Sequence, residues 1–318
     1  MKRTYLILGI ILMALATLLL VAYDLFKPKP ENPYEYSVAE YAQVADSLVS
    51  HMESRQIVLR SGDPKGMAFA DGKIYLLIDS MLQIVLPEGK ELFRTNLGET
   101  PTCISISKSM QVLIGFENHL CLYSMDGRLL KRSALSENKS LYTAVAATNT
   151  SIFVADAAEK EVVIYDFDLQ KKGSFKGESG VSDQHGFIIP SLHFDLSVNP
   201  DGALWVVNPG LHALQNYTES GKLREQWSKT SFTSVGFSGC CNPFQIAFLS
   251  DGSFVTSEKG MVRIKIHKPS GEFASVVAPP TSFKNGHKAP VLAVDENDQI
   301  LALDLDRKMI RIFTPKNP

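Results

Sequence analysis

The sequence predicts an all-β fold, a six-bladed β-propeller, preceded by an N-terminal transmembrane helix and a short linker helix. Two observations predict the propeller: a short apolar segment with a small central residue occurs six times, and turn and strand signals follow it. The segments are Met67-Ala68-Phe69, Ile104-Ser105-Ile106, Val145-Ala146-Ala147, Leu196-Ser197-Val198, Ile246-Ala247-Phe248 and Leu292-Ala293-Val294. Their central residues stand at positions 68, 105, 146, 197, 247 and 293, a spacing typical of propeller blades rather than of helical repeats.

A small central residue suits the innermost strand of a blade, because sheets that converge on one axis leave little room there. The second strand follows a turn that favours hairpins, since Asp71-Gly72, Asp201-Gly202 and Asp251-Gly252 each stand just after an inner strand. A third strand such as Val262-Arg263-Ile264-Lys265 comes next, and a turn such as Ser270-Gly271 leads into a fourth. Each blade is therefore predicted to have four strands.

The last blade lacks one strand of its own. Only residues 314–318 follow its third strand, Ile310-Arg311-Ile312-Phe313, and they are too few for a fourth. Residues 55–60 precede the first blade and belong to no inner strand. We therefore predict that Gln56 to Arg60 supply the outer strand of the last blade, which closes a propeller of residues 55–318 and removes two exposed sheet edges.

The N-terminal segment predicts a single-pass membrane anchor. Residues 5–23 hold no charged side chain and, at about 1.5 Å per residue, span roughly 28 Å, close to a bilayer's hydrocarbon core. Lys2 and Arg3 favour a cytoplasmic position for residues 1–4, which leaves the propeller on the extracytoplasmic side, periplasmic or extracellular. The alternative is a cleaved signal peptide, but its small-x-small signal, Ala14-Leu15-Ala16, lies in the middle of the apolar segment.

Residues 24–54 are predicted to form a linker that contains a short amphipathic helix. Three prolines among polar residues indicate an extended spacer over residues 24–36. Ser37 and Glu40 have capping-box spacing and predict a helix that runs to about Glu53. Its apolar stripe consists of Val38, Tyr41, Val44, Leu48 and Met52. We expect this stripe to pack against the propeller, with a docking helix for a partner as the alternative.

Composition excludes several classes of protein. A formal net charge of −2 and a pI near 6.4 provide no electrostatic reason to bind nucleic acid. Four cysteines in 318 residues exclude a disulfide scaffold. Gly-rich phosphate loops, serine nucleophile elbows and paired zinc motifs are absent from the sequence.

Two long connections lead into inner strands and should meet at one mouth of the central channel. Because functional residues concentrate on loops held by a rigid scaffold, these connections supply the candidate ligand-binding residues. The first spans residues 177–191 and leads to the fourth inner strand, and the second spans residues 226–243. The candidates are His185, Phe187, His193, Asp195, Cys240, Cys241, Asn242 and Gln245.

The adjacent pair Cys240 and Cys241 is the least expected feature of these loops. One interpretation is purely structural, with one buried cysteine and one in a tight turn. A second is a vicinal disulfide, which would form a rigid apolar platform or a labile redox element in an oxidising compartment. A third is metal binding together with His185, His193 or His287, although the spacing of these residues is not that of a structural zinc site.

Several segments resemble NHL repeats. Pro64-Lys65-Gly66-Met67-Ala68-Phe69 matches the pattern Pro-x-Gly-Ile-Ala-Val, and Val154-Ala155-Asp156 followed by Val162-Val163-Ile164-Tyr165-Asp166 matches the later strands of the repeat. The second blade departs from this pattern at Leu113-Ile114-Gly115-Phe116, as does the fourth at Val206-Val207-Asn208-Pro209. The resemblance covers about residues 55–318 and implies a six-bladed propeller. It leaves the role open, because such propellers include scaffolds, protein and RNA binders, and lyase or lactonase relatives.

Lactonase-like propellers hold a divalent cation on the axis, and the resemblance leaves such a cation open here. The candidate oxygen donors near the axis are Asp195, Asn242 and Gln245. The sequence offers no second carboxylate that is equally well placed to bind a cation on the axis. Four other acidic residues follow second strands, where a carboxylate usually accepts hydrogen bonds within a turn, and are interpreted as structural: Asp79, Asp156, Glu258 and Asp304. Cys103 and Cys121 are interpreted as small core residues.

The sequence therefore predicts a binding or scaffold module, a membrane-anchored propeller that presents one channel mouth to a protein partner or a small ligand. No cofactor is predicted. The alternative is a metal-dependent hydrolytic enzyme of the lactonase or lyase type, which would use an axial site.

Overall fold

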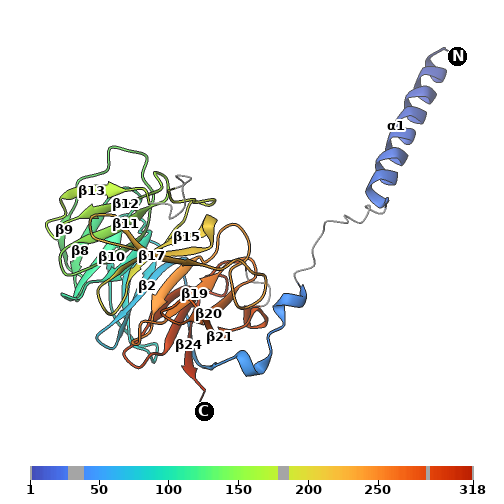
Figure 1. The fold of residues 1–318 in the computed structure, drawn as a ribbon. Coiled ribbons are helices and arrows are strands. Elements are labelled where there is room, and N and C mark those ends of the chain that lie inside the picture. Colours follow the sequence, from blue (N-terminus) through green and yellow to red (C-terminus); the bar gives the residue numbers. More distant parts are fainter. Residues whose placement is uncertain (1, 28–38, 178–185, 284–286, 317–318) are drawn as a thin grey trace. The chain divides into compact units, whose positions relative to one another are not determined.

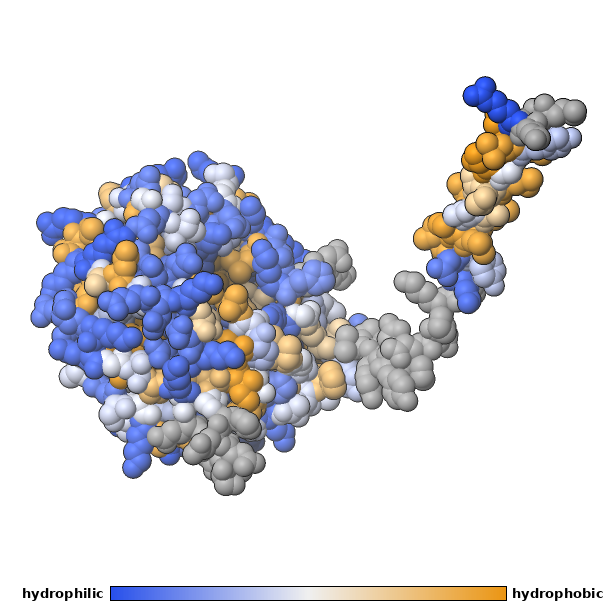
Figure 2. Space-filling model, turned by 90° about the horizontal axis from the view of Figure 1, so that it is seen from above, coloured by the Kyte–Doolittle hydropathy of each residue, from blue (hydrophilic) through white to orange (hydrophobic). Residues whose placement is uncertain are grey.

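The structure is a computed structural model that describes residues 2–27, 39–177, 186–283 and 287–316. Two compact units are distinguished, residues 1–38 and residues 39–318. The first contains helix α1 (Lys2–Phe26), in which Tyr5–Phe26 have a mean hydropathy of 2.7. A helix this long and apolar at an N-terminus is the signature of a membrane anchor and of a signal sequence alike. Figure 2 shows that α1 is hydrophobic along most of its length, whereas hydrophilic side chains predominate on the visible face of the propeller.

The linker helix predicted up to Glu53 is wrong. Ser37 and Val38 lie outside the described residues, and the segment after them forms two short 3-10 helices, η1 (Ala39–Ala42) and η2 (Asp46–Leu48). Strand β1 (His51–Val58) begins soon afterwards. The physical reason is a neighbouring sheet edge: Val49 forms a parallel bridge with Val276, and the Ser50 N–H donates to the Val276 carbonyl at 3.0 Å. These bonds hold the backbone extended, which suits β-branched valines.

Six four-stranded antiparallel sheets make up the propeller (Figure 1), as predicted. Blade 1 consists of β2 (Pro64–Ala70), β3 (Lys73–Ile78), β4 (Met81–Val85) and β5 (Glu91–Asn96). Blade 2 consists of β6 (Cys103–Ile106), β7 (Gln111–Gly115), β8 (Leu120–Ser124) and β9 (Leu129–Arg132). Blade 3 consists of β10 (Tyr142–Ala147), β11 (Ile152–Asp156), β12 (Glu161–Tyr165) and β13 (Lys171–Phe175).

The second half of the ring repeats this arrangement. Blade 4 consists of β14 (Leu196–Val198), β15 (Leu204–Asn208), β16 (Ala213–Tyr217) and β17 (Leu223–Ser228), with the 3-10 helix η3 (Pro209–Leu211) between β15 and β16. Blade 5 consists of β18 (Gln245–Phe248), β19 (Phe254–Glu258), β20 (Arg263–His267) and β21 (Phe273–Ala278), and η4 (Pro280–Phe283) follows it. Blade 6 consists of β22 (Val291–Val294), β23 (Ile300–Asp304), β24 (Met309–Pro315) and β1.

Strand β1 closes the ring, which confirms the closure predicted from the short last blade. It pairs antiparallel with β24, from His51 opposite Pro315 to Val58 opposite Met309. The strand begins and ends earlier than the predicted Gln56 to Arg60. The side chain of Glu53 on β1 accepts two hydrogen bonds from Arg311 on β24, at 2.9 and 2.5 Å.

The inner strands are the six that carry the predicted repeat, β2, β6, β10, β14, β18 and β22. Apolar layers fill the space between neighbouring sheets. Tyr75 and Leu77 of blade 1, for example, pack in one cluster with Val112 and Ile114 of blade 2, and all four are fully buried. Burial of this kind on both faces of each blade provides the main stabilisation of the ring.

Candidate functional site at one mouth of the channel

A cavity of about 500 Å³ lies inside the ring, and residues of all six inner strands line it. At one end stand the residues that open the inner strands or come just before them, namely Lys65, Thr102, Thr143, His193 and Phe244. We call this end the His193 mouth. It is the end into which both long connections lead, as the sequence predicts.

His193 lies against the aromatic ring of Phe244. The two ring centroids are 3.9 Å apart and the planes differ by 7°, while Nε2 lies 3.3 Å from the carbonyl oxygen of Phe244. A carbonyl only accepts hydrogen bonds, so Nε2 carries the hydrogen of the neutral ring and Nδ1 is left as an acceptor. Burial, with a smaller contribution from the charge of nearby Lys259, lowers the pKa of His193 to about 4, although the hydrogen bond with the Phe244 carbonyl opposes this shift. The imidazole is therefore neutral at neutral pH.

Asp195 and Gln245 connect neighbouring blades at this mouth. Asp195 Oδ2 accepts the Ile246 N–H of blade 5 at 2.8 Å, and Gln245 Oε1 accepts the Leu292 N–H of blade 6 at 3.0 Å. Likewise, Thr143 Oγ1 of blade 3 accepts a hydrogen bond from the Phe194 N–H at 3.3 Å. These oxygens hold successive inner strands together. Burial raises the pKa of Asp195 to about 7, despite its hydrogen bonds from Ile246 and Leu196.

The opposite pKa shifts of Asp195 and His193 predict a measurable pH effect. Because folding raises the pKa of Asp195 above its ordinary 3.8, its contribution to stability is complete below that pH and is lost as the pH rises towards 7. Folding lowers the pKa of His193 from 6.5 to about 4, so its contribution is lost as the pH falls across that range. We expect Asp195→Asn to make Tm rise more steeply between pH 4 and 6.5 than in the wild type. Parallel curves of Tm against pH would contradict the shift of Asp195.

The other predicted site residues have structural positions. Phe187 is 5% exposed and packs in the core, with its ring centroid 5.4 Å from that of Phe194 and 5.7 Å from that of Tyr217. Asn242 is also buried, and its side chain bonds to the Ser238 carbonyl and to both backbone groups of Lys259, at 2.7 to 3.1 Å. These two predicted ligand-binding side chains therefore pack within the protein and are not among those that line the channel. His185 lies outside the described residues.

Cys240 and Cys241 stand beside this mouth rather than on the wall of the channel. Both are free thiols, with their sulfurs 3.2 Å apart. Lys259 connects them with the mouth: its ammonium lies 5.5 Å from the centre of the Phe244 ring and donates to Ser191 Oγ at 3.2 Å. Sequence reasoning missed Lys259 and Phe244, because a single lysine after a strand and a single aromatic residue before one form no motif.

The acidic residues interpreted as structural fall into two groups. Asp79, Asp156 and Asp304 accept hydrogen bonds from backbone N–H groups of nearby loops, as predicted. Glu258 differs, because it is fully buried and forms ion pairs with Arg263 at 2.7 Å and Lys265 at 2.8 Å. Cys103 and Cys121 are buried as predicted, and burial raises their pKa values to about 12 and about 11.

The predicted oxygen donors are engaged in hydrogen bonds within the protein. Asp195 and Gln245 already accept backbone hydrogen bonds, and Asn242 is enclosed within its loop. Within the described part of the chain, no group of three or more His, Cys, Asp and Glu side chains is placed to share a metal ion. A cation site of the kind held by lactonase-like propellers therefore finds no support in this donor set.

Comparisons with known proteins reveal similarity of fold only. No family model matches the sequence, and no curated protein matches it. Similar solved structures include a streptogramin B lyase, with 12% identity and a TM-score of 0.60 over 86% of this chain and 100% of that one. Virginiamycin B lyase from Staphylococcus aureus has 14% identity and a TM-score of 0.57, over 82% of this chain and 99% of that one.

A catalytically inactive histidine-to-alanine variant of the S. aureus lyase, with quinupristin, has 16% identity and a TM-score of 0.59 over 82% of this chain and 99% of that one. At such identities the likeness shows a shared six-bladed propeller and nothing about activity. These comparisons do not confirm the resemblance to NHL repeats, since these three structures are lyase propellers. The chain therefore has the fold of these lyases.

Proposed function

We propose that this protein is a membrane-anchored, extracytoplasmic binding module that takes a protein partner or a small ligand at the His193 mouth. The observation that carries the proposal is the stack of His193 on Phe244 at the end of a channel of about 500 Å³. Pockets of this size, with an aromatic wall and a few polar groups, are typical of ligand sites. The carboxyl and amide oxygens of the same mouth are engaged between blades.

The groups around the stack define the chemistry of the ligand. Nδ1 of His193 offers a hydrogen-bond acceptor, and the Lys259 ammonium, 5.5 Å from the centre of the Phe244 ring, offers a positive charge. Leu192, next to His193, is 70% exposed and adds an apolar contact at the rim. These groups suit a ligand surface that combines a hydrogen-bond donor, an apolar part and a negative or polarisable group.

The proposed location follows from α1. The segment Tyr5–Phe26 has the length and hydropathy of a membrane span. Lys2 and Arg3 at its start favour the cytoplasm for that end, so the propeller would face the opposite side.

Photo-crosslinking in native membranes tests the binding proposal. A photoreactive amino acid at position 192 should give a discrete crosslinked product, because this position borders the mouth. The matched control is position 130, an exposed leucine on β9 of blade 2, which should give none. We expect His193→Ala to lower the yield from position 192 about tenfold, through the loss of one hydrogen bond and one stacking contact. Equal yields from positions 192 and 130 would contradict the proposal.

A second candidate function is a lyase, favoured by one observation: a neutral histidine with an open acceptor nitrogen lies at the channel mouth of a lyase-like fold. An elimination needs a group that removes a proton, and Nδ1 of His193 is such a group. Incubation with quinupristin separates the candidates. The binding proposal expects quinupristin to remain unchanged. A product of unchanged mass, absent with His193→Ala, would indicate an elimination and replace the binding proposal, and a gain of one water would indicate hydrolysis.

A further inference from the structure

Cys240 and Cys241 place two thiols in contact at the surface of the propeller. Their sulfurs are 3.2 Å apart, and neither belongs to a disulfide. Cys240 is exposed, whereas Cys241 is 8% exposed. A solute can therefore reach one sulfur while the other lies directly behind it.

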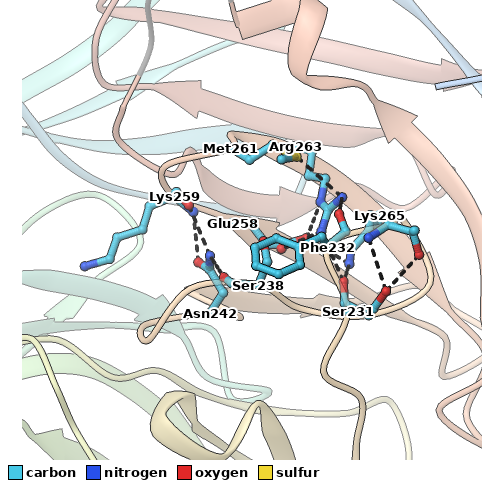
Figure 3. Close-up of polar contacts among 11 residues, drawn as sticks. Ser231, Phe232, Ser238, Asn242, Glu258, Lys259, Met261, Arg263 and Lys265 are labelled. Carbon is cyan, nitrogen blue, oxygen red and sulfur yellow. Dashed lines mark hydrogen bonds and ion pairs between the residues drawn. The ribbon is translucent and has the colours of Figure 1, made fainter. Parts of the chain in front are cut away.

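The loop before this pair is held rigidly by charged side chains of β20. The carbonyl of Gly236 accepts hydrogen bonds from both Arg263 and Lys265, and the carbonyl of Phe232 accepts one from Arg263 at 3.1 Å. Figure 3 shows Arg263 and Lys265 beside this loop, and Glu258 forms an ion pair with each of them. These bonds connect the loop to the interior of blade 5, because Arg263 and Lys265 are fully buried.

The residues on either side of the pair are fixed as well. His212 Nε2 lies 2.5 Å from the Gly239 carbonyl, and its Nδ1 lies 2.8 Å from Thr230 Oγ1. After the pair, Asn242 bonds to the Ser238 carbonyl at 2.7 Å and to the backbone of Lys259, as Figure 3 shows. The two cysteines thus stand on a loop whose backbone is tied down both before and after them.

The surroundings of Cys241 favour its thiolate. Burial disfavours the charged form, but hydrogen bonds from Cys240 and Ser191 and the charge of Lys259 outweigh burial and lower the pKa of Cys241. Cys103 and Cys121 contrast with it, since burial raises the pKa of each thiol. Exposure of one thiol and a positive group beside the other are the features of reactive cysteines.

We propose that Cys240 and Cys241 form a reversible thiol–disulfide couple that exchanges with a small external disulfide. In the forward direction, the exposed Cys240 sulfur attacks the disulfide of oxidised glutathione and forms a mixed disulfide, and the proton of the Cys240 thiol passes to the released glutathione thiolate. The Cys241 thiolate then attacks the Cys240 sulfur, which forms the vicinal disulfide and releases the second glutathione. Two protein sulfurs are oxidised and one glutathione disulfide is reduced. The proton of the Cys240 thiol ends on the first glutathione, and the second glutathione leaves as a thiolate.

The couple also changes the charge near the His193 mouth. In the reduced state the lowered pKa of Cys241 favours a thiolate beside the Lys259 ammonium, which offsets the local positive charge. In the disulfide no thiolate remains, so Lys259 presents its full positive charge beside Phe244. The effect of this charge on a ligand at the mouth rests on the proposed function. Formation of the disulfide does not rest on it.

The test is a redox titration of the full-length protein in detergent. The protein is equilibrated with mixtures of reduced and oxidised glutathione and alkylated with N-ethylmaleimide, and the peptide that carries both cysteines is analysed by mass spectrometry. We expect a form without alkyl groups that is two hydrogens lighter than the dithiol, and its full conversion to the dialkylated form after reduction. Two alkyl groups at every glutathione ratio would overturn the proposal.

Single substitutions identify the role of each sulfur. With Cys241→Ser, we expect the glutathione adduct on Cys240 to accumulate, because the second attack is lost. With Cys240→Ser, we expect adduct formation to slow at least about tenfold, because Cys241 is buried. Rapid adduct formation on Cys241 in that variant would contradict the assigned order of attack.

Lys259 is a positioning residue in this scheme, and Lys259→Gln tests that role. We expect the second step to slow severalfold at pH 7, and the difference to disappear at a pH where the thiol of the variant is also ionised. The matched control is Lys268→Gln, which changes an exposed lysine that pairs with Glu272 on the same blade. Equal rates for the two variants would contradict the role of Lys259. Failure of crosslinking at position 192 would leave these thiol measurements unaffected, so the two proposals fail separately.

Discussion

A chain that begins at Ser61 is expected to aggregate, or to unfold at a Tm at least about 10 °C below that of a chain that begins at Ala39. The shorter chain lacks β1, so β24 becomes an exposed edge of blade 6. Exposed edges promote aggregation, because their unpaired N–H and C=O groups can pair with another chain. The chain from Ala39 contains the whole compact unit of the propeller.

Several losses add up to this expected effect. Arg311 is 4% exposed and loses the two hydrogen bonds to Glu53, which leaves it with the Ser282 carbonyl at 2.9 Å and Asp304 at 3.6 Å. Ile57 leaves the apolar cluster that contains Ile310 and Ile312. Together these losses are on the order of 5 kcal/mol, and in a domain of this size each kcal/mol lowers Tm by about 2–4 °C.

A chain that begins at Ser50 is the matched control. It lacks residues 39–49 but keeps β1, so a large loss of Tm should occur only between the start at Ser50 and the start at Ser61. Thermal unfolding followed by circular dichroism, with light scattering for aggregation, measures both differences. Equal Tm values for the chains from Ser50 and Ser61 would show that β1 does not stabilise the closed ring.

The ring could be predicted from sequence because its signals are local and repeated. A small residue between two apolar ones recurs in every inner strand, and the Asp-Gly turns mark the hairpins that follow. Closure was predictable by elimination, since the last blade lacked one strand. The linker helix failed for the opposite reason: the segment around Val49 is extended by its pairing with Val276, a contact that spans most of the chain.

The candidate site could be predicted only in its location. The long connections do lead to one mouth, but the role of each side chain depends on partners that are distant in sequence. Asp195 was a candidate ligand because it precedes an inner strand, yet its carboxylate bonds to Ile246 of the next blade. Phe187 seemed accessible on a long loop, yet it packs among aromatic residues of the core. Lys259 matters through its distance to Phe244, which no local pattern reveals.

The buried ion-pair cluster in blade 5 also depends on contacts that the sequence pattern does not reveal. Glu258 follows a second strand, where a carboxylate is typical of a turn, and the sequence therefore suggested hydrogen bonds within a turn. Instead, Glu258 is the shared counterion of Arg263 and Lys265, and all three are fully buried (Figure 3). The two cations in turn bond to carbonyl oxygens of the loop before Cys240.

Glu258→Gln is expected to lower the stability of the propeller by about 3–5 kcal/mol, or Tm by about 10 °C, because it leaves two buried cations without their carboxylate. Burial already lowers the pKa of Lys265 to about 8, even with Glu258 present. Without Glu258 this pKa falls further, so the folded variant releases the Lys265 proton at a lower pH than the folded wild type. The cost of the substitution should therefore shrink as the pH rises towards 8.

Glu272→Gln provides the matched control, since it makes the same chemical change in an exposed ion pair. The side chains of Glu272 and its partner Lys268 are 66% and 53% exposed. Exposed pairs contribute little to stability, so its Tm should stay close to that of the wild type at every pH. Thermal unfolding at pH 6 and pH 8 measures both variants.

In the Glu258→Gln variant the loop before Cys240 should also become more accessible, which limited proteolysis would detect as faster cleavage near residues 229–243. If both variants unfold at the wild-type Tm, the buried carboxylate is not the group that holds the two cations and their loop in place.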